Sequence, residues 1–213
     1  MKIEFVSDVV CPWCAVGLNA LERALERLGP VPVEWHIEPF ELNPGMPPGG
    51  EDVLEHLARK YGASPEQLHG THEVLRTRGA AAGFTFELGR RRRIVNTFDA
   101  HRLLHWAGLQ GRQRELKHRL FAAYFTEGRD PSDADVLQRL AAEAGLDAGA
   151  AREVLAGGAY ADDVRARERH WTDRGIHSVP AVIVDGRHLI QGGQPPEVFE
   201  QALRRIMQAA SSG

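Results

Sequence analysis

Segments with the alternating pattern of β-strands occur at the two ends of this sequence, with a long helix-rich stretch between them, and this order limits the folds open to the chain. Near the N-terminus, residues 2–6 and 31–38 alternate polar and apolar side chains, as half-buried strands do. Between them a helical pattern begins at Pro12, which suits a first helical turn, and ends at Gly29-Pro30. The order is β-α-β, a unit that joins parallel strands by a right-handed crossover.

The C-terminal end has a second strand-containing unit. Residues 181–184 and 188–190 are expected to form two strands, because Asp185-Gly186 between them is a typical hairpin turn. A last helix is expected near residues 196–209. If this β-β-α unit shares one sheet with the N-terminal unit, the fold class is α/β with a mixed sheet.

The middle of the chain is rich in Ala, Leu, Arg and Glu and is divided by Gly, Pro and Asp. Helices are expected near residues 51–61, 65–82, 97–109, 113–127, 133–144, 148–156 and 160–174. We therefore expect residues 1–45 and 175–213 to form the sheet-containing domain. Residues 46–174 are expected to be a large all-helical insertion that covers one end of the sheet.

Composition and charge exclude several classes of protein. The chain is 43% apolar and 26% charged, as in ordinary globular domains, and its net charge of −3 predicts no general attraction to nucleic acid or anionic membranes. No apolar run approaches the roughly 20 residues that span a bilayer. Residues 1–6 have neither a basic leader nor a long apolar region, so the expected location is the cytoplasm, with a removed leader left open.

The chemistry is expected at the chain's two cysteines, in Cys11-Pro12-Trp13-Cys14, where the first strand leads into the first helix. Two cysteines are too few for a disulfide-stapled scaffold or for a typical structural zinc site. Cys11 lies at the expected helix N-terminus, where free N–H groups and the helix dipole favour a thiolate. Cys14 is one turn further on, placed to attack a mixed disulfide formed at Cys11. We therefore expect Cys11 to be the nucleophile and Cys14 the resolving thiol.

Two other interpretations of these residues stay open at this point. The cysteines can simply lie three apart in a core helix, although Pro12 and the strand-to-helix position then have no explanation. A metal site lacks a second ligand pair. His69 and His72 have His-x-x-His spacing, but they lie on a polar helix without an obvious third ligand and are expected to be surface residues.

Further along, Ser178-Val179-Pro180-Ala181 leads directly into an expected strand, which together with the cysteine pair is the thioredoxin pattern. The sequence resembles the DsbA-like thioredoxin superfamily, specifically its FrnE branch. The matching segments span nearly the whole chain in order: Ser7-Asp8, Cys11 to Cys14, Pro39 to Pro44, Asn96-Thr97, Ala100 to Leu103, Phe121 to Gly128, Val179-Pro180 and Gly192 to Gln194.

The resemblance implies a thioredoxin-like mixed sheet with the helical insertion over its active-site end. It implies a thiol–disulfide oxidoreductase that acts on protein or small thiol substrates without cofactor or metal, with glutathione left open as a co-substrate. Pro180 is expected to be a cis-proline opposite the cysteines, and Val179 to offer its backbone to the substrate. Some members of the branch use further cysteines near the C-terminus. This chain has none there, so a relay through a second pair is not expected.

Several accessory residues carry two interpretations each. Asp8 is either a proton relay for thiol exchange or the cap of a turn. His101 either lies over the cysteines and binds substrate, or is a buried histidine on a packed helix. Trp13 and Phe40 are expected to form an apolar rim for peptide binding, with ordinary core as the other interpretation of Phe40. Pro12 is also expected to bind substrate. The run Arg90 to Arg93 is a solvated face unless it lies near the site, where it would attract an acidic thiol such as glutathione.

The same branch resembles 2-hydroxychromene-2-carboxylate isomerases and kappa-class glutathione transferases, which bind glutathione and do not need a second cysteine. A glutathione-dependent isomerase or transferase is therefore the alternative function. A binding module with an inert disulfide is a third. Retention of both cysteines favours the redox enzyme. The direction of the redox cycle, the reduction potential, the physiological substrate and the oligomeric state are not predicted.

Overall fold

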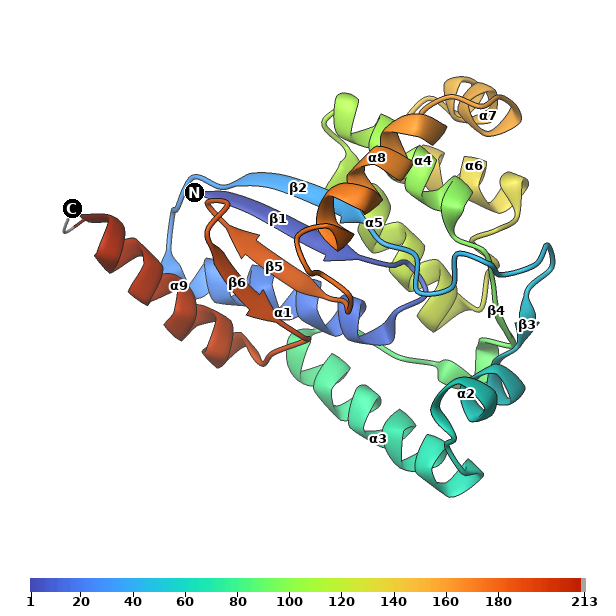
Figure 1. Ribbon diagram of the computed structural model, residues 1–213, viewed down its shortest axis with the longest axis horizontal. Coiled ribbons are helices and arrows are strands. Elements are labelled where there is room, and N and C mark those ends of the chain that lie inside the picture. The colour runs from blue at the N-terminus through green and yellow to red at the C-terminus, as the bar shows by residue number, and fades with distance from the viewer. Residues whose placement is uncertain (212–213) are drawn as a thin grey trace.

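The computed structural model describes residues 1–211 and is built around a four-stranded sheet with the order β2-β1-β5-β6 (Figure 1). β1 (Lys2–Ser7) is parallel to β2 (Glu34–Pro39), and α1 (Pro12–Leu28) connects them. β1 is antiparallel to β5 (Ala181–Val184), which pairs with β6 (His188–Gln191). The two ends of the chain therefore share one mixed sheet, as the sequence predicted.

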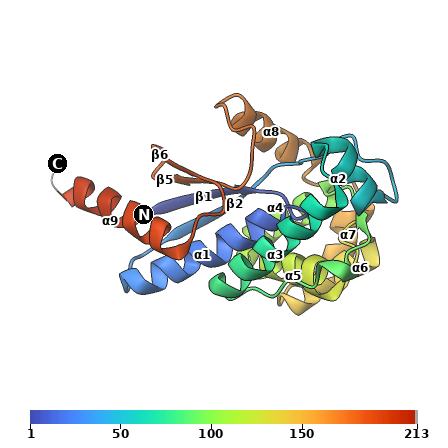
Figure 2. The ribbon, with the colours of Figure 1, turned by 90° about the horizontal axis from the view of Figure 1, so that it is seen from below.

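Helices cover both faces of this sheet (Figure 2). α1 and α9 (Pro196–Ser211) lie on one face, and α8 (Ala161–Thr172) lies on the other. The alternation of β1 explains the two layers. Phe5 is fully buried in the core that contains α1 and α9, whereas its neighbour Val6 packs against Trp171 of α8. Burial of each such side chain contributes about 1.5–3 kcal/mol to the free energy of unfolding.

The segment between β2 and β5 is mainly helical. Its elements before α8 are β3 (Glu51–Asp52), α2 (Val53–Tyr61), α3 (Pro65–Ala82), the 3₁₀-helix η1 (Leu88–Arg90), β4 (Arg93–Ile94), α4 (Phe98–Leu109), α5 (Gln113–Ala122), the π-helix η2 (Ala123–Glu127), α6 (Ala134–Glu143) and α7 (Ala148–Ala156). The expectation of an all-helical insertion was wrong in one respect, because β3 and β4 form a short antiparallel pair. Two-residue strands are too short to show alternation in a sequence.

Several expected boundaries differ from the structure by a few residues, and two of these differences have clear local reasons. The strand expected at 31–38 begins at Glu34, after Pro32, which has no N–H to donate to the sheet. The helix expected at 51–61 begins at Val53, because the Asp52 side chain accepts hydrogen bonds from the backbone N–H groups of the first turn. Both differences move an element's first residue without changing the order of elements.

The helical segment and the sheet share a hydrophobic core. One continuous cluster of buried side chains includes Phe5 of β1, Leu103 of α4 and Phe125 of η2. The division into residues 1–45 with 175–213 and residues 46–174 stays a prediction. Among the described residues, no helix has the length and hydropathy needed to cross a membrane.

Candidate functional site

Cys11 lies at the N-terminal end of α1, where the chain turns out of the sheet into the helix. Its backbone is extended, with φ −89° and ψ 111°, and Pro12 is the first helical residue. The Cys11 carbonyl accepts hydrogen bonds from the backbone N–H groups of Cys14, at 3.1 Å, and Ala15, at 3.4 Å. The cysteine pair is therefore held within the first turn of α1, at the end where free N–H groups stabilise negative charge.

The two thiols have different surroundings. Cys11 is 4% exposed and lines a cleft, whereas Cys14 is fully buried. Burial raises the pKa of the Cys14 thiol well above its ordinary value, and the neighbouring Cys11 raises it further through a hydrogen bond and its charge. The charge of Lys117 acts in the opposite direction. Cys11 is thus the thiol that substrate can reach, and Cys14 is a shielded thiol that stays protonated at neutral pH.

The loop before β5 brings a second element of the site, a proline, beside Cys11. The Val179–Pro180 peptide bond is cis, as the resemblance implied. The Cys11 thiol donates a hydrogen bond to the Val179 carbonyl oxygen, with Sγ and O 3.7 Å apart. Pro180 packs against α1 at Gly17, where a Cβ atom would lie only 3.0 Å from the proline ring. A glycine in mid-helix therefore lets the proline loop lie close to the cysteines.

A cleft of about 660 Å³ opens beside Cys11 and is walled by the start of α1, the loop after β2, α2, α3 and the loop before β5. Pro12, Trp13 and Phe40, which were expected to bind substrate, line it, and so does Val179. Pro180 and His101 are not among its lining residues. The structure thus brings most of the predicted substrate-binding residues to one surface, where their role stays a prediction.

Basic side chains surround this cleft. Arg91 is the member of the run Arg90 to Arg93 that lines it, and its side chain is buried beside the rings of Tyr124 and Phe125 in η2. The Arg91 Nε makes no hydrogen bond with any described residue. The arginine run is therefore not simply a solvated face, since one of its four guanidinium groups is buried at the cleft.

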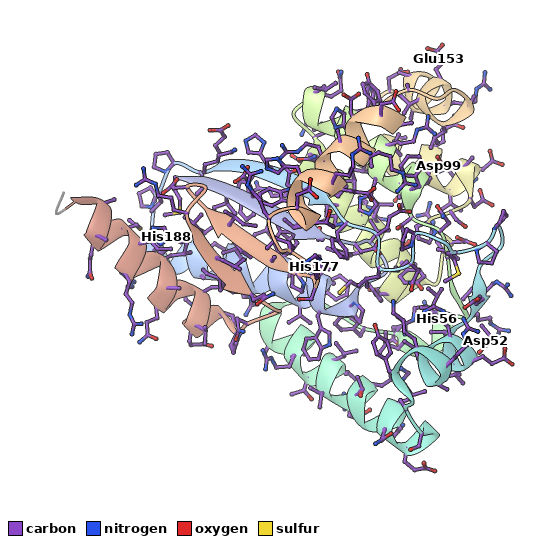
Figure 3. The ribbon with its side chains drawn as sticks, in the orientation of Figure 1. Asp52, His56, Asp99, Glu153, His177 and His188 are labelled. Atoms are coloured by element: carbon purple, nitrogen blue, oxygen red, sulfur yellow. The ribbon has the colours of Figure 1, made fainter. Side chains whose placement is uncertain are left out.

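The wall formed by α2, α3 and the proline loop adds Lys60, His56, His72 and His177 to the cleft lining. His56 and His177 come from separate elements, α2 and the loop before β5 (Figure 3). Burial lowers the pKa of Lys60, whose ammonium donates hydrogen bonds to the loop after β2. His72, expected on the open surface, has a buried Nε2 without a hydrogen-bond partner. An anionic substrate would meet the ammonium group of Lys60 and the guanidinium group of Arg91 here.

Asp8 is fully buried in the loop between β1 and α1. Its carboxylate accepts a 2.7 Å hydrogen bond from the Leu42 N–H, and the His101 Nε2 lies 3.5 Å from its other oxygen. Burial by itself would raise the pKa of Asp8, but His101, Leu42 and Lys117 together lower it below its ordinary value. Asp8 is therefore ionised at neutral pH. His101 contacts Asp8 and not the cleft, so no contact supports its predicted role in substrate binding.

Sequence reasoning missed Lys117 of α5, which is fully buried. Burial lowers its pKa to about 8, and the nearby charges of Cys14, Asp8 and Cys11 oppose that shift. A signal was present, because Lys117 has the three- and four-residue spacing to Leu120 and Phe121 that places all three on one helix face. In the described part of the chain, no three His, Cys, Asp or Glu side chains are grouped so that they could hold a metal ion.

The two thiols should differ in reactivity towards alkylating reagents. With limiting iodoacetamide at neutral pH, we expect the reduced protein to be modified first at Cys11, because Cys14 is buried and its raised pKa keeps it protonated. Mass spectrometry of peptides taken at successive times measures both rates. Equal rates at the two cysteines in the folded protein would contradict the assignment of nucleophile and resolving thiol, and unfolded protein in urea serves as the control in which the difference disappears.

Comparisons with known proteins cover nearly the whole chain. The family model of the DSBA-like thioredoxin domain matches residues 2–204. A curated relative, the uncharacterized protein YwbO of Bacillus subtilis, is 30% identical over 204 residues, which are 95% of this chain and 96% of the relative. The crystal structure of a probable DsbA oxidoreductase from Streptomyces coelicolor is 40% identical, with a TM-score of 0.88 over 96% of this chain and 89% of that one.

Two more distant structures have a similar fold. A 2-hydroxychromene-2-carboxylate isomerase is 14% identical, with a TM-score of 0.73 over 100% of this chain and 98% of that one. The cytosolic disulfide reductase DsbM of Pseudomonas aeruginosa is 20% identical, with a TM-score of 0.66 over 98% of this chain and all of that one, and has also been solved with GSH. At these identities the likeness concerns the fold alone.

Proposed function

Because this chain belongs to the DsbA-like thioredoxin domain family, we propose that it is a thiol–disulfide oxidoreductase that works through Cys11 and Cys14 without a bound cofactor or metal. The observation that carries the proposal is the pairing of a thiol at the cleft with a buried thiol in the same helical turn. A protein that only bound a thiol ligand would have no use for the second, shielded cysteine. The cis Val179–Pro180 bond beside Cys11 supports the same proposal.

The proposed reaction proceeds in two exchanges at sulfur. The Cys11 thiolate attacks a substrate disulfide, forms a mixed disulfide and releases the first substrate thiolate. Cys14 then attacks the Cys11 sulfur, forms the Cys11–Cys14 disulfide and releases the second thiolate. The reverse sequence oxidises a substrate dithiol. The same geometry serves both directions, so the reduction potential decides which one prevails.

The cleft supports two kinds of substrate within this proposal. An extended peptide would contact the Val179 carbonyl and the apolar rim of Trp13 and Phe40. A small thiol with carboxylates, such as glutathione, would be attracted by Arg91 and Lys60. The GSH complex of DsbM supports glutathione as a co-substrate. The description of DsbM as cytosolic fits the cytoplasmic location that we include in the proposal.

A glutathione-dependent isomerase or transferase is the alternative. The basic cleft beside Cys11 favours it as well, because such an enzyme also needs to hold an anionic thiol next to the helix N-terminus. What distinguishes it is the second cysteine. An isomerase has no step in which Cys14 must lose its proton or form a bond.

Wild-type protein tested in parallel assays decides between these functions. We expect it to accelerate insulin reduction by a thiol, and to form the Cys11–Cys14 disulfide reversibly in glutathione buffers of defined ratio, with mass spectrometry as the readout. The isomerisation of 2-hydroxychromene-2-carboxylate with glutathione is measured beside it. Isomerisation without any dithiol cycling would replace our proposal with the alternative. If the protein is inactive in all of these assays and its Cys11–Cys14 disulfide cannot be reduced, a binding module is favoured.

A further inference from the structure

The redox cleft accounts for only one member of the run Arg90 to Arg93, because Arg91 lines the cleft and the other three arginines do not. A second cavity, of about 240 Å³, lies between this run and the end of η2, and we call it the arginine cavity. Its charged lining residues are Arg90, Arg91, Arg92, Arg93, Arg129 and Asp130. The lining therefore carries a large excess of positive charge.

Ion pairs within the protein do not neutralise this charge. In the described part of the chain, no carboxylate lies within ion-pair distance of the run Arg90 to Arg93, whereas Arg129 pairs with two glutamates. Asp130 is the acidic residue of the lining, and its Oδ1 accepts hydrogen bonds from the Ser132 N–H, at 2.8 Å, and hydroxyl, at 2.6 Å. The positive charge of the run is thus available to an anion from outside the protein.

Two of these guanidinium groups retain hydrogen-bond donors. Arg91 is 95% buried, since only 5% of it is exposed, and its Nε has no hydrogen-bond partner among the described residues. An arginine stays charged even when buried, and a buried charge without a partner lowers the stability of a fold. The rings of Tyr124 and Phe125, each centred 5.7 Å from the guanidinium carbon, offset only part of this cost. Arg92 is exposed, and its side chain has no hydrogen bond or ion pair with a described residue.

The backbone around the arginine cavity is held in place by η2, a π-helix, which is a rare form that is frequent at functional sites. The Tyr124 hydroxyl donates a 2.7 Å hydrogen bond to the Arg93 carbonyl. At the end of η2, Gly128 has a φ of +73°, and a Cβ atom there would lie 2.8 Å from the Arg90 Cβ. The run is therefore fixed against η2 near both of its ends, so a ligand would meet an arrangement that is already formed.

The ligand chemistry follows from the guanidinium group and from the size of the cavity. The guanidinium fork matches the oxygens of carboxylates and phosphates. Several guanidinium groups around one small volume favour a tetrahedral dianion, which accepts hydrogen bonds from several directions, over a planar carboxylate with a single charge. We propose that the arginine cavity binds the phosphate group of a small molecule, either inorganic phosphate or a phosphate monoester.

Arg91 connects this site to the redox centre, because it lines both the arginine cavity and the cleft beside Cys11. A phosphate dianion bound at Arg91 cancels the positive charge that this side chain contributes to the cleft. Bound phosphate therefore weakens the attraction of anionic thiols and disulfides to Cys11 and leaves uncharged substrates unaffected. This consequence rests on the proposed function, whereas phosphate binding does not.

Isothermal titration calorimetry with inorganic phosphate, at an ionic strength held constant with sodium chloride, tests the site. We expect a single site in the wild type, and binding weaker by about tenfold or more in Arg91→Gln and in Arg92→Gln, because each loses charge-assisted hydrogen bonds. Arg187→Gln is the matched control, since it removes an exposed arginine from the turn between β5 and β6, and it should match the wild type. Titration with phosphoserine distinguishes the two sources of the phosphate group. Tighter binding of phosphoserine would assign the site to a monoester, and tighter binding of inorganic phosphate to the free anion.

The same titrations can overturn the site. Arg92 is exposed, so Arg92→Gln is expected to fold even if Arg91→Gln does not, and circular dichroism checks both. A wild type that binds neither phosphate nor phosphoserine, or an Arg92→Gln variant that binds as tightly as the wild type, would refute the proposal. A single-stranded oligonucleotide that binds when phosphate does not would show that the arginines form a surface for a polyanion instead.

Stopped-flow reaction of the reduced protein with two disulfides tests the connection to the cleft. Ellman's reagent carries two carboxylates, and dithiodipyridine is uncharged. Saturating phosphate should slow the attack of Cys11 on Ellman's reagent by about tenfold, the lower end of the effect of cleft charges on association rates, and should leave the attack on dithiodipyridine nearly unchanged. Arg91→Gln should react slowly with Ellman's reagent whether or not phosphate is present.

The outcomes of this experiment separate the connection from the proposed function. An unchanged reaction with Ellman's reagent at saturating phosphate would overturn the connection between the two cavities. A Cys11 that attacks neither disulfide would refute the proposed function, and phosphate binding would still be decided by calorimetry.

Discussion

Insulin reduction is expected to fall by roughly a hundredfold or more in Cys14→Ser, because the second thiol acts as an intramolecular nucleophile of high effective concentration. The Cys14 N–H donates to the Cys11 carbonyl, so the attacking and attacked residues are held in one helical turn. Without Cys14, a mixed disulfide at Cys11 can be released only by a second, external thiol. The variant should therefore accumulate mixed disulfides, which mass spectrometry detects directly.

Cys11→Ser is the matched control, since it changes the same side chain at the other end of the pair. It should lose turnover and form no mixed disulfide with substrate, because the remaining thiol is fully buried. Both variants are also tested for glutathione-dependent isomerisation. Undiminished insulin reduction in Cys14→Ser would contradict the two-thiol mechanism. If the wild type shows no redox turnover and Cys14→Ser still catalyses the isomerisation, the alternative function is established.

The second large effect is expected on stability, from Asp8→Asn. Asp8 is fully buried, its Oδ1 lies 3.5 Å from the His101 Nε2, and its charge acts on the buried Lys117. Removing its charge leaves Lys117 without a buried counter-charge, and loss of one partner from such a pair costs about 3 kcal/mol or more. We expect a decrease of this size in the free energy of unfolding at neutral pH, measured by urea denaturation of the reduced protein.

The pH dependence of this effect follows from the two pKa shifts. The pKa of Asp8 is lowered in the folded protein, so its charge contributes stability above the unfolded-state pKa, and that contribution is lost as the pH falls through the folded-state value. The pKa of Lys117 is lowered from 10.5 to about 8, so the buried ammonium destabilises the fold below about 8 and ceases to do so above 10.5. The difference between Asp8→Asn and the wild type should be largest near neutral pH and smaller in strong acid and strong alkali.

The double variant Asp8→Asn with Lys117→Met provides the control for this interpretation. Because it removes both charges, it should regain much of the stability that Asp8→Asn loses. Any remaining decrease in the free energy of unfolding would measure the weakening of the hydrogen bond from the Leu42 N–H, which an asparagine oxygen can still accept in part. A pH-independent loss, or a double variant no more stable than Asp8→Asn, would show that the charge pair is not what Asp8 contributes.

Local patterns in the sequence carried much of the fold. Alternation over residues 2–6 placed the central strand, and the capping box formed by Ser64 and Gln67 makes the start of α3 predictable from adjacent residues. The β3–β4 pair was not predictable in this way. Glu51 and Ile94 are paired although 43 positions separate them, and neither two-residue strand has a pattern of its own.

The features of the site also fall into two groups, those that short sequence motifs predict and those that depend on the tertiary structure. The Cys-x-x-Cys spacing, Pro12 at the first helical position and the Val179-Pro180 dipeptide are short motifs, so the sequence by itself determined where the cysteine pair lies and which loop lies beside it. The order of the two cysteines' roles stays a prediction. Each of these depends on neighbours within a few residues, or on a family pattern that a sequence displays directly.

Only the tertiary structure decided what surrounds the thiols. Lys117 and Arg91 belong to charged segments whose usual place is the surface. The spacing of Lys117 to Leu120 and Phe121 indicates a buried helix face, but nothing near Lys117 or Arg91 in the sequence shows what either side chain is buried against. Lys117 is buried because α5 packs against α1, which is about a hundred residues away in the chain. Arg91 is buried because the segment after η1 packs against η2, which follows it by about thirty residues. A side chain's solvation, and with it the pKa of Cys14 and Lys117, is the sum over everything packed around it, and that sum exists only once the chain has folded.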